Sequence, residues 1–292
     1  MRRFLLFLSS ALTLLLALPA WAQTTSVFIW KVSRPETPTR CSYLIGTVHL
    51  PMASQSTLPQ IVKQAIASSS TFVMETDLSR LTPSKLRRFI NDPQGNDLQR
   101  KLEPSEWKKL VGLEARKGVD EAMIPYFKPW FLSLMISMPA NPPQTILDSV
   151  LRSEAEADHL TIAFLETPSQ QFAQLDRVDS QETLLMLKEA IDDPQHDEKD
   201  IRAIAADYRR GNLKALERDV FDPFEMKQTP DFYRCTIDQR NARWLPTFQR
   251  AAAHGRMVIA VGLAHLIGRH GLLLELKKEG YRVERLSTRP TR

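Results

Sequence analysis

Apolar residues fall into two patterns along the chain, short continuous runs and longer runs with a helical period. Strand-like runs at residues 27–32 and 41–45 flank a proline-containing segment, which predicts a hairpin. Residues 58–68 carry apolar side chains at helical spacing, and residues 71–74 follow as a short buried strand. This order of strand, helix and strand favours a right-handed parallel crossover in one sheet.

The middle of the chain predicts helices, because apolar residues recur at helical spacing and prolines separate the segments. A buried strand at residues 161–165 interrupts this pattern. The predicted helices include residues 84–90, 105–117, 130–136 and 146–158, and more helices extend from about 169 to 254. Residues 130–136 are apolar nearly all round, so we expect this helix to be buried.

The C-terminal residues return to an alternation of strands and helices. They predict a strand at 257–261, a loop at 262–268, a helix at 272–279 and a strand at 281–286. Both ends of the chain therefore supply strands. We predict an α/β fold, a single mixed or parallel β-sheet flanked by helices with a large inserted helical region, at about 78–160 and 169–254.

Residues 1–22 are typical of a secretory signal. Two arginines precede an apolar run over residues 4–18, and the small-residue segment 20–22 ends it. We expect cleavage near Ala22, a single domain over residues 23–292, and a secreted or periplasmic protein. An uncleaved anchor is the alternative, but the apolar run is shorter than the roughly 20 residues of a spanning helix. No later segment is long and apolar enough to cross a bilayer.

The charge balance argues against a nucleic-acid partner. The chain has 39 Lys and Arg against 34 Asp and Glu, a net charge of +5. Loss of residues 1–22 would remove two arginines and no acid, so the balance becomes 37 against 34 and the net charge +3. Basic residues are interleaved with acidic ones and form no cluster, so we expect no nucleic-acid binding.

Two cysteines, Cys41 and Cys235, are present. An oxidising compartment permits a disulfide between them, and two buried thiols are the alternative. A bridge requires Cα atoms within about 7 Å. Cys41 opens a predicted strand, whereas Cys235 lies close to Arg240, which we place near the far end of that strand. The two requirements conflict, and the pairing stays open.

Two of the six histidines occur in the same local frame. Gly46-Thr47-Val48-His49 follows one predicted strand, and Gly262-Leu263-Ala264-His265 follows another. With 10 Gly and 6 His in the chain, chance predicts about 0.2 such motifs. A glycine at a strand end lets the backbone turn sharply and approach a ligand, so each histidine would lie just past such a turn.

Acidic residues also follow predicted strands. Glu75 comes directly after a short apolar run, with Asp77 close behind, and Glu166 follows another run. If the strands are parallel in one sheet, His49, Glu75 and His265 meet at one edge. Two histidines and one carboxylate are a known set of ligands for a divalent metal ion, so we predict these three as metal ligands. Glu166 would be a fourth ligand, a general base or a group that orients the others.

Each of these residues also has a structural explanation. A histidine after a strand is often a loop residue, and a glutamate before a turn often binds a backbone amide. The joint pattern nevertheless favours a functional site. The other histidines lack the repeated frame and are interpreted as surface or loop residues: His159, His196, His254 and His270. The chain has no Gly-rich phosphate loop, His-Glu-x-x-His helix or Gly-x-Ser-x-Gly elbow, which disfavours three common enzyme classes.

Arg240 and Asn241 lie on a helix predicted over about residues 231–253. Arg240 and Trp244 share one face of this helix, so a buried tryptophan beside a snorkelling arginine is a sufficient structural account. The functional alternative is that Arg240 steadies a substrate carboxylate or a developing oxyanion. We therefore predict Glu166 as the catalytic base and Arg240 as the group that stabilises charge.

Together these blocks resemble the TraB/PrgY/GumN family and, more distantly, the Tiki metalloproteases. They occur in family order over most of residues 27–286. The segments that carry the resemblance are Leu44-Ile45-Gly46-Thr47-Val48-His49-Leu50-Pro51, Val73-Met74-Glu75-Thr76-Asp77, Leu165-Glu166-Thr167, Arg240-Asn241-x-x-Trp244, Val261-Gly262-Leu263-Ala264-His265, Gly271-Leu272-Leu273 and Gly280-Tyr281-x-Val283.

The resemblance implies a fold shared with erythromycin esterase and the ChaN lipoprotein, and an active centre of paired Gly-x-x-His motifs with a glutamate. For the Tiki branch it implies peptidase activity that depends on manganese or cobalt, with zinc or iron as alternatives. His49, His265 and Glu75 stand at those motif positions. The second motif reads Gly-Leu-Ala-His, where relatives more often show Gly-Ala-Gly-His or Gly-Ala-Leu-His, so its loop has less freedom.

The leading prediction is a secreted, metal-dependent hydrolase that acts on a peptide or small-molecule substrate. One alternative is a non-catalytic protein that binds haem or iron through the same histidines. A second is an esterase in which a histidine and a glutamate activate water without a metal. A family member that only scaffolds a partner is the third.

Overall fold

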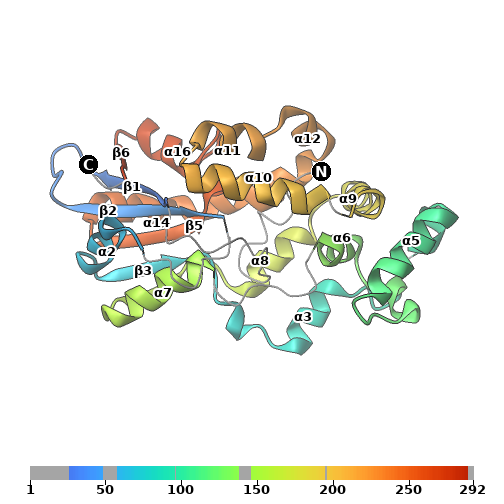
Figure 1. Cartoon of the computed structure of the whole chain (residues 1–292). Coiled ribbons are helices and arrows are strands. Elements are labelled where there is room, and N and C mark those ends of the chain that lie inside the picture. Colours follow the sequence, from blue (N-terminus) through green and yellow to red (C-terminus); the bar gives the residue numbers. More distant parts are fainter. Residues whose placement is uncertain (1–25, 49–57, 96, 138–145, 195, 289–292) are drawn as a thin grey trace.

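The fold is built on one mixed six-stranded sheet. The computed structural model describes residues 26–48, 58–95, 97–137, 146–194 and 196–288. Within these residues the strands have the order β4-β3-β5-β2-β1-β6, with helices on both sides of the sheet (Figure 1). The strands are β1 (Phe28–Ser33), β2 (Cys41–Thr47), β3 (Thr71–Met74), β4 (Thr161–Phe164), β5 (Met257–Gly262) and β6 (Arg282–Leu286). The predicted α/β class is confirmed.

Strand pairing brings the ends of four strands to one edge. β1 pairs antiparallel with β2, which confirms the predicted hairpin, and with β6. β2, β5, β3 and β4 are parallel neighbours in that order. The crossover from β2 to β3 is therefore parallel as predicted, but the two strands are not adjacent, because β5 from the C-terminal part of the chain lies between them. All four parallel strands end at the same edge, where ligands bind in open α/β sheets.

The helical segments agree with most of the predicted ranges. Those before β4 are α2 (Gln60–Ala67), η1 (Leu78–Arg80), α3 (Pro83–Ile90), α4 (Leu98–Lys101), α5 (Pro104–Ala115), η2 (Glu121–Tyr126), α6 (Pro129–Ser137) and α7 (Leu147–Ala157). Those after β4 are α8 (Pro168–Leu175), α9 (Ser180–Asp192), α10 (His196–Arg210), α11 (Leu213–Val220), α12 (Pro223–Gln228), α13 (Pro230–Tyr233), η3 (Arg234–Asp238), α14 (Gln239–His254), α15 (Leu263–Leu266) and α16 (Leu272–Lys278).

Two predicted segments differ from the structure. The loop expected at residues 262–268 contains α15, a single helical turn. The helix expected over about 231–253 is divided into α13, the π-helical segment η3 and α14. A π-helical turn inserts an extra residue and changes which side chains face the sheet, and such turns are frequent at functional sites. η3 ends just before the residues that enter the cluster described below.

Apolar packing forms two cores. The larger one surrounds the sheet, where α14 packs against β1 and β2 and α7 packs against β4 and α2. The smaller core joins α5, α6, α9 and η2 through residues such as Leu110, Leu132 and Leu187. α5 lies far from the sheet in Figure 1. α6 is buried by both cores, as the apolar pattern at residues 130–136 predicted.

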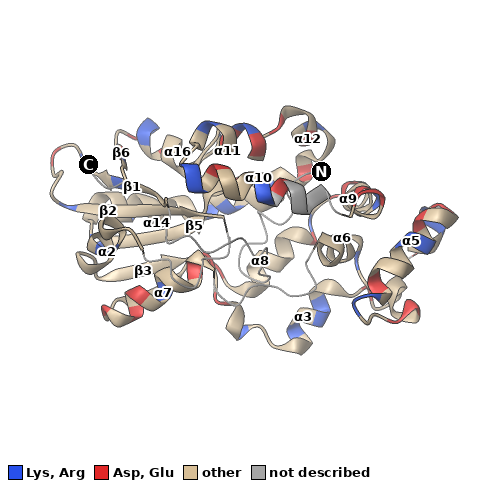
Figure 2. Ribbon diagram, viewed as in Figure 1, with Lys and Arg blue, Asp and Glu red and all other residues tan. Residues whose placement is uncertain are grey.

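Charged side chains of both signs lie along the outer helices, and the strands carry few of them (Figure 2). Within the described residues no helix is long and apolar enough to cross a membrane. Cys41 is half-buried and Cys235 is buried, and both are free thiols. The signal sequence predicted at residues 1–22 lies outside the described residues.

Glu114 is an unusual member of the smaller core. It is fully buried on α5, and within the described part of the chain neither of its carboxylate oxygens has a hydrogen-bond partner. Burial raises the pKa of Glu114 to about 7, although the charge of Lys117 opposes this shift. Burial also lowers the pKa of Lys117. The helical region therefore contains a carboxyl group whose charged form is disfavoured because it is removed from water.

The raised pKa of Glu114 predicts a pH-dependent stability. The folded state holds the proton more tightly than the unfolded chain, so stability is greatest below the ordinary glutamate pKa and falls as pH rises towards about 7. We expect Glu114→Gln to increase the free energy of unfolding at about pH 8 by on the order of 2 kcal/mol, with little change at about pH 4. Urea denaturation at both pH values measures this. Glu217→Gln on an exposed face of α11 is the control, and an equal effect of both variants would contradict the account.

Candidate active site at the carboxyl ends of the strands

Two glutamates lie side by side at this edge of the sheet. Glu75 comes directly after β3, and Leu165 separates Glu166 from the end of β4. The Glu166 amide donates to the Glu75 carbonyl oxygen at 3.0 Å. This bond continues the parallel ladder between the two strands past their ends. Thr167 then begins α8 with a capping box, in which the Thr167 hydroxyl accepts from the Gln170 amide. The abrupt change from strand to capped helix fixes the position of Glu166.

The second Gly-x-x-His motif reaches the same place. β5 ends at Gly262, whose amide donates to Oε1 of Glu75 at 2.7 Å, and α15 follows with His265 buried. Gly46 of the first motif lies beside this turn, and a Cβ there would come within 2.5 Å of the Leu263 side chain. Gly46 thus lets α15 pack closely against β2, and a larger residue there would force the Leu263 side chain to move. It provides space, not the sharp turn that the motif suggested.

Arg240, at the start of α14, lies between the two glutamates. Its side chain is 2% exposed, and Nη2 donates to Oε2 of Glu75 at 2.6 Å. Nε donates to Oε1 of Glu166 at 2.9 Å. Arg243, one turn further along, adds a bond of 3.3 Å from Nη2 to Oε2 of Glu166. The structural alternative was a buried Trp244 beside a snorkelling Arg240. Trp244 is buried, but Arg240 does not snorkel, because two carboxylates hold its guanidinium inside the protein.

The charges of this cluster depend on one another. Burial by itself would lower the pKa of Arg240, but Glu75 and Glu166 outweigh it, so the pKa is raised and the guanidinium remains charged. Burial raises the pKa of Glu166, and the charge of Glu75 adds to this, while Arg240 and Arg243 oppose it. A carboxyl group with a raised pKa near a reacting centre is suited to proton transfer.

Asn241 determines which nitrogen of His265 carries the proton. The Asn241 Nδ2 group donates to the backbone oxygens of His265 at 3.1 Å and His270 at 2.9 Å, which directs its Oδ1 to Nδ1 of His265 at 2.8 Å. Nδ1 must therefore carry the hydrogen. On the other side, Nη1 of Arg240 lies 3.1 Å from Nε2 of His265, and a guanidinium can only donate. His265 is thus neutral, with the Nε2 lone pair directed into the cluster.

Trp244 closes the cluster on its apolar side. Its ring lies 4.5 Å from the Arg240 guanidinium carbon and 4.5 Å from the His265 ring, both measured to ring centroids. The backbone oxygen of Thr236, in η3, accepts a further bond of 3.4 Å from Nη1 of Arg240. The π-helical segment therefore contributes directly to the position of the guanidinium.

Four of the five predicted site residues come together here: Glu75, Glu166, Arg240 and His265. The fifth, His49, lies outside the described residues. Asn241, Arg243 and Trp244 were not predicted to have site roles, although their positions next to Arg240 and one turn beyond it are the sequence signal that could have indicated them. The amide of Gly262 is a further contributor that side-chain patterns could not reveal.

The described part of the cluster does not contain a full set of ligands for a divalent ion. Among the described residues no group of three or more His, Cys, Asp or Glu side chains is arranged to hold a metal ion. Glu75 and a neutral His265 are donors of the type that such an ion takes. Both contact the same guanidinium, which places a permanent cation beside any ion that they would share.

These features define an α/β protein with a buried Arg-Glu-His cluster at the carboxyl ends of its parallel strands. A model of the TraB/PrgY/gumN family matches residues 28–285. The chain belongs to this family, as its sequence motifs predicted.

Curated relatives agree with this assignment. The chain is 24% identical to Metalloprotease TIKI2 from Danio rerio, over 91% of this chain and 62% of the relative. It is 22% identical to the uncharacterized protein YbaP of Shigella flexneri, over 80% of this chain and 86% of that one. YbaP from Escherichia coli (strain K12) is also 22% identical. The chain thus spans less than two thirds of the length of the zebrafish protein. No solved structure gives a significant match.

The buried ion pairs predict a large effect of removing Arg240. We expect Arg240→Met to lower the free energy of unfolding by about 3 to 5 kcal/mol, because two buried carboxylates lose their counter-charge. Arg243→Met is the matched control on the same helix. Its side chain is 37% exposed, so we expect a loss of no more than about 1 kcal/mol. The loss caused by Arg240→Met should shrink in a Glu166→Gln background, and an equal loss in both backgrounds would contradict the electrostatic account.

The role of Asn241 predicts a defined histidine tautomer. Nitrogen NMR of the labelled protein should show His265 protonated at Nδ1 and not at Nε2, because of the bonds from Asn241 and Arg240. Asn241→Leu should remove this preference, whereas a substitution at exposed His254 should leave the His265 signals unchanged. Protonation at Nε2 in the unaltered protein would show that the assignment is wrong.

Proposed function

We propose that the chain is a hydrolase that cleaves a peptide or other amide bond at the cluster of Glu75, Glu166, Arg240 and His265. The observation that carries this proposal is the buried guanidinium, which holds two carboxylates and faces the unprotonated nitrogen of a neutral histidine. Buried ionisable groups that perturb one another's pKa values cluster at functional sites. Similarity to Metalloprotease TIKI2 supports the reaction class.

Each residue has a proposed role. Glu166 acts as the general base, because burial raises the pKa of its carboxyl group and so makes it a better proton acceptor. Arg240 holds Glu75 and Glu166 in place and supplies positive charge where negative charge develops on the substrate. Asn241 keeps His265 in the tautomer in which Nε2 is unprotonated. Trp244 excludes water from one side of the group.

We further propose that His49, Glu75 and His265 hold a divalent ion, with manganese or cobalt favoured by the resemblance to the Tiki branch. A bound ion of this kind would polarise the scissile carbonyl and lower the pKa of a bound water molecule. A metal ligand must present an unprotonated nitrogen, and Nε2 of His265 is unprotonated; it accepts from Nη1 of Arg240, so ion binding would replace this hydrogen bond. Protein export by the segment at residues 1–22 is part of the same proposal.

The position of Arg240 favours a second candidate. The guanidinium already occupies the space between Glu75 and His265 and supplies the positive charge that a metal would otherwise provide. In this candidate the His265 and Glu166 side chains activate water for amide or ester hydrolysis without a metal. The two candidates share the cluster and differ in their dependence on an ion.

One experiment tests both candidates. Metal content is measured for the purified protein, His49→Ala, His265→Ala and the exposed control His254→Ala, and each protein is assayed on a peptide library with and without a strong chelator. We expect loss of bound metal in the first two variants only, and a fall in turnover of about 100-fold or more in chelator.

Two outcomes would overturn parts of the proposal. Equal metal content in all four proteins with undiminished turnover in chelator would refute the metal site and favour the metal-independent candidate. No turnover of any peptide or ester, with circular dichroism showing a folded protein, would refute the hydrolase.

A further inference from the structure

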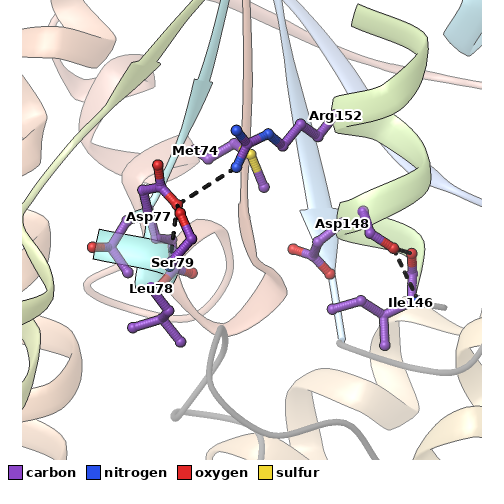
Figure 3. Close-up of a pocket in the computed structure, with 10 residues that line it drawn as sticks. Met74, Asp77, Leu78, Ser79, Ile146, Asp148 and Arg152 are labelled. Carbon is purple, nitrogen blue, oxygen red and sulfur yellow. Dashed lines mark hydrogen bonds and ion pairs between the residues drawn. The ribbon is translucent and has the colours of Figure 1, made fainter. Parts of the chain in front are cut away.

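A small hollow adjoins the cluster on the side of Glu75. Its volume is about 210 Å³, and its walls come from the end of β3, from η1 and from the first turns of α7 (Figure 3). This volume is below the roughly 300 to 1,000 Å³ of pockets for whole ligands. The hollow is therefore suited to one chemical group of a larger substrate, held next to the reacting bond.

Among the residues that line this hollow, acidic side chains outnumber basic ones by three to one. Asp77 and Asp148 lie on opposite sides of it (Figure 3), and Glu75 is a further lining residue. Asp148 is held by the Thr47 hydroxyl, which donates to Oδ1 at 2.9 Å. Asp77 accepts from the Ser79 hydroxyl at 2.6 Å and from Nε of Arg80, which lies outside the lining, at 3.2 Å. Both aspartates are at least nine-tenths buried, so solvent screens their charge weakly.

Arg152 is the one cationic side chain among the described residues that line the hollow. Its Nε donates to Oε1 of Glu156 at 2.8 Å, and its Nη1 lies 3.6 Å from Oδ1 of Asp77. Burial tends to raise the pKa of Asp77, but the Ser79 bonds and the charge of Arg152 outweigh it, so the pKa is lowered. Asp77 is therefore ionised at neutral pH, and Arg152 is engaged by carboxylates.

Thr76 provides an independent sign of a ligand. It lines the same hollow, is 4% exposed, and its hydroxyl has no hydrogen-bond partner among the described residues. A buried hydroxyl without a partner is costly, and natural proteins satisfy nearly all such groups. Since the neighbouring walls are acidic, the missing partner is best supplied by a donor that carries positive charge.

We propose that this hollow binds a protonated primary amine of the substrate, with the carboxylates of Asp77 and Asp148 around it and the Thr76 hydroxyl as an acceptor. The inference rests on the proposed function and deepens it, because it names the substrate class. The amine has two sources, the free N-terminus of a peptide or the end of a lysine side chain. The nearest carbonyl carbon lies two bonds from an N-terminal amine and six bonds from a lysine amine, so the two sources would place the scissile bond at different distances from the hollow.

Equilibrium binding tests this assignment without requiring turnover. Isothermal titration of the full chain uses alaninamide against N-acetylalaninamide for the N-terminal source, and N-acetyl-lysinamide against N-acetylnorleucinamide for the lysine source. We expect one amine to bind at least about tenfold more tightly than its neutral partner, as a charge-assisted hydrogen bond requires. The pair that shows the difference identifies the source.

Two variants and a control locate the effect. Asp148→Asn keeps an acceptor for Thr47 but removes the charge, and Thr76→Val removes only the hydroxyl. Each should weaken the amine by several-fold without changing the neutral probe. Asp158→Asn, at the exposed end of α7, should have no effect. Equal affinity for amine and neutral probes, no binding of any probe, or unchanged binding in Asp148→Asn would overturn the assignment.

The results separate this inference from the proposed function. Amine binding that depends on Asp148, without turnover of any peptide or ester, would support the hollow and refute the hydrolase. Turnover of a peptide or ester, together with equal affinity for amine and neutral probes, would support the hydrolase and refute the hollow as an amine site.

Discussion

The buried guanidinium of Arg240 is the interaction on which the rest of the site depends. Removing a charged group from water costs several kcal/mol, and the cost is offset only when partners of opposite charge are close and well oriented. Here Glu75 arrives from β3, Glu166 from β4 and Arg240 from α14, so the ion pairs join three elements that are distant in sequence. Helix, sheet and site must therefore form together.

The same arrangement sets the charges of the groups in the cluster. Two guanidiniums, those of Arg240 and Arg243, balance the two carboxylates, and burial adds a penalty for every ionised group. His265 avoids a further charge by staying neutral, since Arg240 donates to one nitrogen and Asn241 accepts from the other. The cluster thus contains a buried carboxylate and an unprotonated imidazole nitrogen in the same small volume.

Much of the fold could be predicted from sequence, because short apolar runs and helical periods report local burial directly. The strand ends also indicated Glu75, Glu166 and His265, since parallel strands bring their carboxyl ends to one edge. Two features depend on long-range packing and were not accessible. Periodicity cannot show that β5 separates β2 from β3, and it cannot distinguish a snorkelling Arg240 from one held by two glutamates.

The position of β5 has a consequence for how the molecule matures. This strand is contributed by residues 257–262, yet it is the central link between β2, with its hairpin partner, and the pair β3 and β4. A nascent polypeptide lacking its last segment has no bridge between the two halves of the sheet and no His265. The cluster of Glu75, Arg240 and His265 therefore cannot assemble on the ribosome before residues 257–265 have been synthesised, and pairing of such remote strands is intrinsically slow.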